Sequence, residues 1–127
     1  MILIVDDDEG MGETCSMLLE AHGYEVATVQ SGKAALESLR TVLPELILSD
    51  YTMPEMNGGE LTELVKADPK TAMLPAILMT ASMKCEIEKP QLYDGFLRKP
   101  FRAENLLLEV RKLLAKVDAT SEQLAST

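Results

Sequence analysis

The chain alternates short, strongly apolar runs with longer amphipathic stretches, and this alternation limits its fold more than any other feature. Five runs have the length and composition of strands, and they lie at residues 2–5, 24–29, 46–48, 76–79 and 96–97. The run at 24–29 is the most polar of them and is expected nearer an edge of the sheet. Helical patterns lie at residues 11–21, 32–42, 59–67 and 106–117.

Strands that alternate with helices form parallel βαβ units with right-handed crossovers. We therefore expect an α/β fold, in which a doubly wound five-stranded parallel sheet carries helices on both faces. In the third helical segment, Leu61, Leu64 and Val65 repeat at helical spacing.

Length and charge indicate one globular domain that does not contact nucleic acid directly. A chain of 127 residues suffices for one hydrophobic core and is too short for two. We assign residues 1–117 to this domain and residues 118–127 to a polar C-terminal tail or linker stub. The net charge of −9 argues against direct nucleic-acid binding, which requires a basic surface.

Cysteine use and hydropathy point to a cytoplasmic protein. Cys15 and Cys85 lack the spacing of metal ligands and fit a reducing compartment. No apolar run is long enough to span a membrane, and the first residues lack the basic region of a signal peptide. We therefore predict a cytoplasmic location without membrane insertion.

Polar side chains follow four of the five apolar runs, at the point where each run ends. They are Asp6, Asp7 and Asp8 after the first run, Ser49 and Asp50 after the third, Thr80 after the fourth, and Arg98 and Lys99 after the fifth. Ligands of open parallel sheets bind outside the carboxyl ends of the strands. The sequence thus predicts one cleft that contains several carboxylates, a hydroxyl group and an ammonium group.

This combination suits the transfer of a phosphoryl group to a carboxylate. A carboxylate can act as a nucleophile and form an aspartyl phosphate. The other carboxylates would repel the donor unless a divalent cation neutralised them, and Mg²⁺ (or Mn²⁺) prefers such oxygen ligands. A hydroxyl group and a lysine can hold the phosphoryl oxygens, so catalysis would rest on positioning and charge stabilisation.

Over roughly residues 1–117 the chain resembles a response-regulator receiver domain of the single-domain, chemotaxis-regulator-like type. The resemblance rests on Ile2–Asp8, Leu46–Gly58, Ile77–Ala81 and Lys99–Phe101. It implies a flavodoxin-like fold and a place in a two-component phosphorelay. It also implies a sensor histidine kinase or histidine phosphotransfer protein as phosphoryl donor, and a downstream protein as target. Such a domain is no enzyme beyond catalysing its own phosphorylation and dephosphorylation.

The resemblance gives roles to the acidic residues and to the loop that follows the third strand. Asp50 would be the phosphoacceptor. Asp7 and Asp50 would bind Mg²⁺, Asp6 would assist through water, and Thr52 would offer its backbone carbonyl to the metal. Asp8 has no role in this scheme and is interpreted as a solvated loop acid.

The resemblance also gives roles to residues at the ends of the fourth and fifth strands. Thr80 would hydrogen-bond the phosphoryl group, and Lys99 would pair with it. Phe96 matches an aromatic switch position that turns inward when Thr80 moves. The Lys99–Pro100 bond is expected to be cis.

One region departs from the family pattern. The stretch between Thr80 and Lys99 is a few residues shorter than usual, and it contains Pro90, which would cost roughly 3 kcal/mol or more inside a helix. We therefore expect a shortened fourth helix that ends near Lys89 or is broken there. In the family this helix, the fifth strand and the last helix form the output face, so we expect a remodelled output surface.

Two other functions compete with the receiver interpretation. Asp6–Asp8 after an apolar strand is similar to the acidic motif of haloacid-dehalogenase-type phosphatases, but Gly10 stands where Thr or Val is usual, and Asp50 is left unexplained. The second alternative is a phosphorylation-independent binding module of the same fold. Such modules usually lack part of the acidic site, which is complete here.

Overall fold

A computed structural model, which describes residues 1–81 and 93–125, contains the expected five-stranded parallel sheet. Its strands are β1 (Ile2–Val5), β2 (Val26–Val29), β3 (Leu46–Asp50), β4 (Ala76–Thr80) and β5 (Gly95–Arg98). All neighbouring strands pair in parallel, in the order β2-β1-β3-β4-β5. This confirms the predicted doubly wound sheet, with β2 at an edge as its polar sequence indicated.

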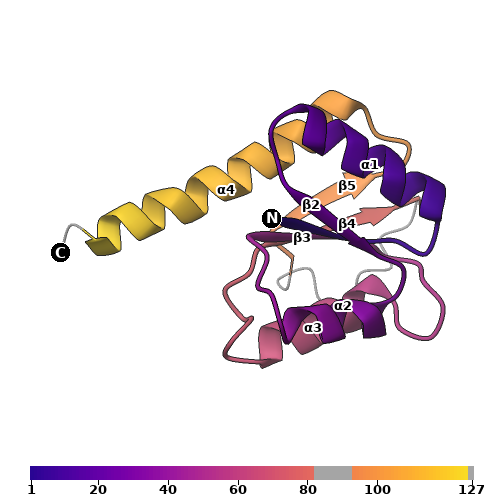
Figure 1. Ribbon diagram of the computed structural model, residues 1–127, viewed down its shortest axis with the longest axis horizontal. Helices are drawn as coiled ribbons and strands as arrows, with labels where there is room; N and C mark the ends of the chain where they lie inside the picture. The colour runs from indigo at the N-terminus through magenta and orange to yellow at the C-terminus, as the bar shows by residue number, and fades with distance from the viewer. Residues whose placement is uncertain (82–92, 126–127) are drawn as a thin grey trace.

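Helices cover both faces of the sheet. They are α1 (Glu9–Ala21), α2 (Gly32–Leu39), α3 (Gly58–Ala67) and α4 (Ala103–Ala125). Figure 1 shows α1 and α4 on one face of the sheet and α2 and α3 on the other. The helix expected between β4 and β5, and with it the prediction that this helix is shortened, falls on residues outside the described part of the chain. None of the described helices is long and apolar enough to cross a membrane.

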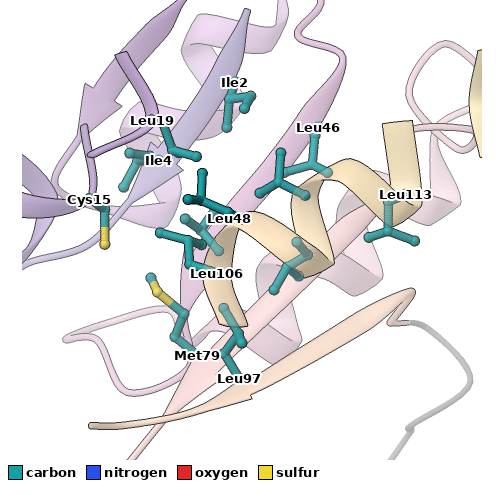
Figure 2. Close-up of a cluster of buried hydrophobic side chains, with 13 residues drawn as sticks. Ile2, Ile4, Cys15, Leu19, Leu46, Leu48, Met79, Leu97, Leu106 and Leu113 are labelled. Carbon is teal, nitrogen blue, oxygen red and sulfur yellow. The ribbon is translucent and has the colours of Figure 1, made fainter. Parts of the chain in front are cut away.

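The sheet separates two hydrophobic cores, because successive side chains of a strand point to opposite faces. Ile2 and Ile4 of β1 pack with α1 and α4, where Leu19 and Leu106 are completely buried (Figure 2). Leu3 and Val5 of the same strand pack with residues of α2 and α3 on the other face. Burial on both faces explains why the central strands are continuous apolar runs rather than alternating ones.

Three polar side chains fix where the helices begin. Asp8, Ser31 and Asn57 cap α1, α2 and α3, and each accepts a hydrogen bond from a backbone N–H of the first turn. Asn57 forms a full capping box with Glu60. Asp8 is exposed, as expected of a solvated loop acid, and its side chain also caps α1, which starts at Glu9 rather than at the predicted Met11.

Two helices end away from their predicted positions. α2 ends at Leu39 rather than at Val42, shortly before Pro44, whose ring disfavours the helical conformation of the preceding residue. α4 continues through Val117 to Ala125, so most of the segment interpreted as a polar tail is helical. Figure 1 shows this end of α4 projecting away from the sheet.

Substitutions at two leucines of α4 test the placement of its buried face. Leu106 is completely buried and Leu108 is 62% exposed. Leu106→Ala is expected to lower the free energy of unfolding by about 2–5 kcal/mol, because it leaves a cavity. Leu108→Ala is expected to change it by less than about 0.5 kcal/mol. Urea denaturation followed by circular dichroism measures both, and equal effects would contradict this packing.

Candidate functional site

Three carboxylates meet at the carboxyl edge of the sheet. Asp6 follows β1, Asp7 is its neighbour, and Asp50 is the last residue of β3. Because β1 and β3 are adjacent, with Val5 opposite Ser49, the chain brings Asp6 and Asp50 side by side. Carboxylate oxygens of Asp6, Asp7 and Asp50 all lie within 4.8 Å of one another. The sequence predicted this convergence, whereas the roles of the three residues stay predictions.

Lys99 joins the buried carboxylates. Its Nζ lies 3.3 Å from Asp6 Oδ2 and 3.3 Å from Asp50 Oδ1. The Lys99 backbone N–H donates to the carbonyl oxygen of Thr80 at 2.7 Å, which ties the end of β5 to that of β4. The predicted cis Lys99–Pro100 bond is confirmed.

Thr80 and Phe96 lie on the two strands beside the carboxylates. Thr80 is the last residue of β4 and is 5% exposed, next to the strand that carries Asp50. Phe96 belongs to β5 and is 40% exposed. Their assignment as phosphoryl contact and aromatic switch stays a prediction.

The electrostatics of the site show an excess of negative charge. Burial raises the pKa of Asp50, Lys99 works against this shift, and the charges of Asp6 and Asp7 add to it. Burial would lower the pKa of Lys99, but the carboxylates of Asp50 and Asp6 outweigh burial and raise it. Among the described residues, the Lys99 ammonium contacts Asp6 and Asp50, and Asp7 adds a third carboxylate to the same group. Hard oxygen donors with uncompensated charge fit a small divalent cation.

The loop after β3 is held close to that strand by backbone hydrogen bonds. The Gly58 N–H donates to the Tyr51 carbonyl at 2.8 Å, and the Met56 N–H donates to that of Pro54 at 2.7 Å. Glu55, which lies between Pro54 and Met56, has a φ of 67° and is the central residue of a strained three-residue turn. Thr52 lies in this loop and is exposed, and its role as a metal ligand stays a prediction.

Sequence reasoning missed three features around the acids. The Asp8 N–H donates to Asp6 Oδ1 at 2.9 Å, which fixes this carboxylate. At Gly58, a Cβ would stand 2.5 Å from the Asp50 carbonyl oxygen, so the position excludes any side chain. Asn57-Gly58 was visible in the sequence only as a turn former. Burial first, and then the charge of Asp6, raise the pKa of Cys15 to about 11, so this thiol stays protonated at neutral pH.

Comparison with known proteins places the chain among signalling domains. The family model described as "Response regulator receiver domain" matches residues 2–111. Over 125 residues, the chain is 28% identical to the DNA-binding response regulator MtrA of Mycobacterium tuberculosis, and the match covers 98% of this chain and 55% of MtrA. The chain thus spans about half the length of such curated relatives.

Two solved structures share both the fold and about a third of the sequence. The signal receiver domain of a signal transduction histidine kinase from Syntrophus aciditrophicus has a TM-score of 0.82 and 33% identity, with 91% of this chain and 90% of that chain covered. The chemotaxis response regulator CheY4 of Vibrio cholerae has a TM-score of 0.79 and 31% identity, with 88% and 96% covered.

Two glycine substitutions near the carboxylates should change the free energy of unfolding in opposite directions. Gly58→Ala places a methyl group against the Asp50 carbonyl and Leu78, and is expected to lower the free energy of unfolding by about 1–3 kcal/mol. At Gly12, inside α1, a Cβ would meet its nearest neighbour at 3.9 Å. Gly12→Ala is therefore expected to raise stability by about 0.5–1 kcal/mol. Thermal and urea denaturation measure both effects. A Gly58→Ala protein as stable as the wild type would contradict the close approach of Gly58 to the Asp50 carbonyl.

Proposed function

Because this chain belongs to the response regulator receiver domain family, we propose that Asp50 accepts a phosphoryl group from a phosphohistidine. The donor is a sensor histidine kinase or a histidine phosphotransfer protein. One observation carries the assignment to Asp50: its carboxylate shares a site with those of Asp6 and Asp7 and contacts the Lys99 ammonium. Asp50 is the only one of the three that ends a strand, between β1 and β4 in the sheet.

The transfer step uses the ionised form of Asp50. A carboxylate oxygen attacks phosphorus, the phosphorus–nitrogen bond of the phosphohistidine breaks, and the imidazole takes up a proton. Lys99 favours this ionised form against burial, since its ammonium lies 3.3 Å from Asp50 Oδ1. Asp7 and Asp50, assisted by Asp6 and by the Thr52 carbonyl, would hold Mg²⁺ (or Mn²⁺), which supplies positive charge for the phosphoryl oxygens.

Neighbouring strands then respond to the new phosphoryl group. Lys99 pairs with one of its oxygens, because the ammonium already reaches Asp50. Thr80 donates its hydroxyl to another oxygen, and Phe96 turns inward, which changes the surface offered to a downstream protein. The chain catalyses only its own phosphorylation and dephosphorylation. Its cytoplasmic location stays a prediction.

The two alternatives lack a supporting observation. A phosphatase that used Asp6–Asp8 would have no use for Asp50, yet Asp50 lies within the same group of carboxylates. A binding module independent of phosphorylation would not need a buried lysine that contacts both Asp6 and Asp50.

A small phosphodonor tests the acceptor. Incubation with acetyl phosphate and Mg²⁺ should add one phosphoryl group to the intact protein, detected by mass spectrometry, and Asp50→Ala should abolish the addition. Asp8→Ala is the matched control on an exposed neighbouring acid: it should cost about 1 kcal/mol of stability through the lost cap and leave labelling intact. Labelling of the Asp50→Ala protein at the wild-type rate would overturn the assignment.

Titration with Mg²⁺ separates the metal ligands from the phosphoryl contact. Asp7→Asn should weaken Mg²⁺ binding at least about tenfold, or roughly 1.4 kcal/mol, because it removes a charged ligand. Lys99→Ala should keep or increase Mg²⁺ affinity, since it removes a competing positive charge, yet it should lower phosphorylation. Calorimetry or NMR shifts of Asp7 and Asp50 report binding. A Lys99→Ala protein that loses Mg²⁺ binding while still folded would contradict these roles.

A further inference from the structure

A groove of about 1000 Å³ lies at the C-terminal ends of α2 and α3. Leu36, Leu39, Leu43 and Leu64 form its apolar walls. α3 begins near Asp50, since a Cβ on Gly58 would lie 2.5 Å from the Asp50 carbonyl oxygen, and α2 begins at Gly32, against Met56 of the loop that follows Asp50. The groove is therefore at the opposite end of the helices from the carboxylates, and it is a separate site.

The groove lies where α2 and α3 end, and α2 is the shorter of the two helices. α2 has eight residues and ends at Leu39, whereas α3 has ten. Leu64, which has the helical spacing of the buried Leu61 and Val65, is 46% exposed, and Leu43 is 56% exposed. Two further exposed apolar side chains follow these helices, Val42 (51%) and Met73 (84%). Apolar side chains that gather at one place on a surface mark an interaction site more often than scattered ones do.

Two cations border the apolar walls. Arg40 and Lys70 line the groove and are exposed, and within residues 1–81 and 93–125 neither forms an ion pair. The one carboxylate in the lining, that of Asp68, accepts the Lys70 backbone N–H at 2.9 Å within its own turn. On a chain with a net charge of −9, the groove thus combines leucines with two unpaired positive charges.

We propose that this groove binds an acidic amphipathic helix of a partner protein. The apolar face of that helix packs on Leu43 and Leu64, and its carboxylates face Arg40 and Lys70. An open channel between two helices suits a third helix, which is recognised through apolar anchors about one turn apart. An acyl chain would instead require an enclosed pocket that buries most of its surface. Charge complementarity selects an acidic partner over a basic one.

Packing connects the loop of residues 51–57, which follows Asp50, with the starts of the two helices whose other ends form the groove. Met56 of this loop lies so close to the first residue of α2 that a Cβ on Gly32 would stand 2.6 Å from its sulfur. α3 begins at Gly58, directly after the same loop. Binding in the groove does not require phosphorylation, so the proposal stands apart from the acceptor role of Asp50.

The test uses a synthetic helical peptide of roughly 15 residues, long enough for four turns, with Leu on one face and Glu on the other. Added to the ¹⁵N-labelled chain, it should shift NMR signals of Leu36, Leu43, Leu64 and Thr71 saturably. The double variant Arg40→Glu/Lys70→Glu should weaken binding at least about tenfold, and Leu43→Ser/Leu64→Ser should do the same. All four positions are exposed, so the variants should keep the wild-type circular dichroism spectrum.

Matched controls decide the outcome. Arg40→Lys/Lys70→Arg keeps the charges and should retain affinity, as should Arg111→Glu, which reverses an exposed charge on α4. Equal affinity for a peptide with Lys in place of Glu would overturn the proposal, as would unchanged binding by Arg40→Glu/Lys70→Glu. If decanoate shifts the groove signals and the acidic peptide does not, the groove is a site for small amphiphiles and the proposal fails.

Discussion

The ammonium group of Lys99 lies between two carboxylates that are almost removed from water, and the rest of the site depends on this contact. Asp6 is 2% exposed and Asp50 is 8% exposed. Two buried negative charges at such close range would be costly without a positive partner. The partner comes from the far end of the chain, since Lys99 reaches Asp6 across 93 positions of sequence. The parallel strand order β2-β1-β3-β4-β5 brings those segments to the same edge.

Close backbone packing also holds the segment around Asp50 in place. Gly58 lies against the Asp50 carbonyl, and the Ser49 hydroxyl donates to that carbonyl at 2.9 Å. The capping box of Asn57 and Glu60 fixes the start of α3 at the same point. Asp50 thus ends a strand and lies against the start of a helix, and Glu55 in the loop between them has a positive φ. Such preorganisation suits a reaction that relies on positioning.

The sequence predicted those features that follow from periodicity and from the geometry of parallel sheets. The carboxyl ends of parallel strands converge at one edge of the sheet, so the grouping of Asp6, Asp7, Asp50 and Lys99 could be predicted from the sequence. Features that depend on tertiary packing could not be predicted in this way. Leu64 has the same helical spacing as its buried neighbours Leu61 and Val65, yet it is exposed and lines the groove beside the end of α2. The roles of Asp8 and Gly58 were missed for a similar reason, because capping and close approach depend on where neighbouring segments lie.

The length of α4 has a mechanical consequence. The helix contains 23 residues, and Leu113 is the last of its residues described as buried. The remaining twelve residues, 114–125, extend the helix by about 18 Å at ~1.5 Å per residue. If α4 tilts as a rigid body on the packing of Leu106, Val110 and Leu113 against the sheet, these residues form a lever arm with that packing as its pivot. A tilt of only ~10° at that pivot would displace the far end by roughly 3 Å, which converts a small repacking of the core into a movement the size of a side chain.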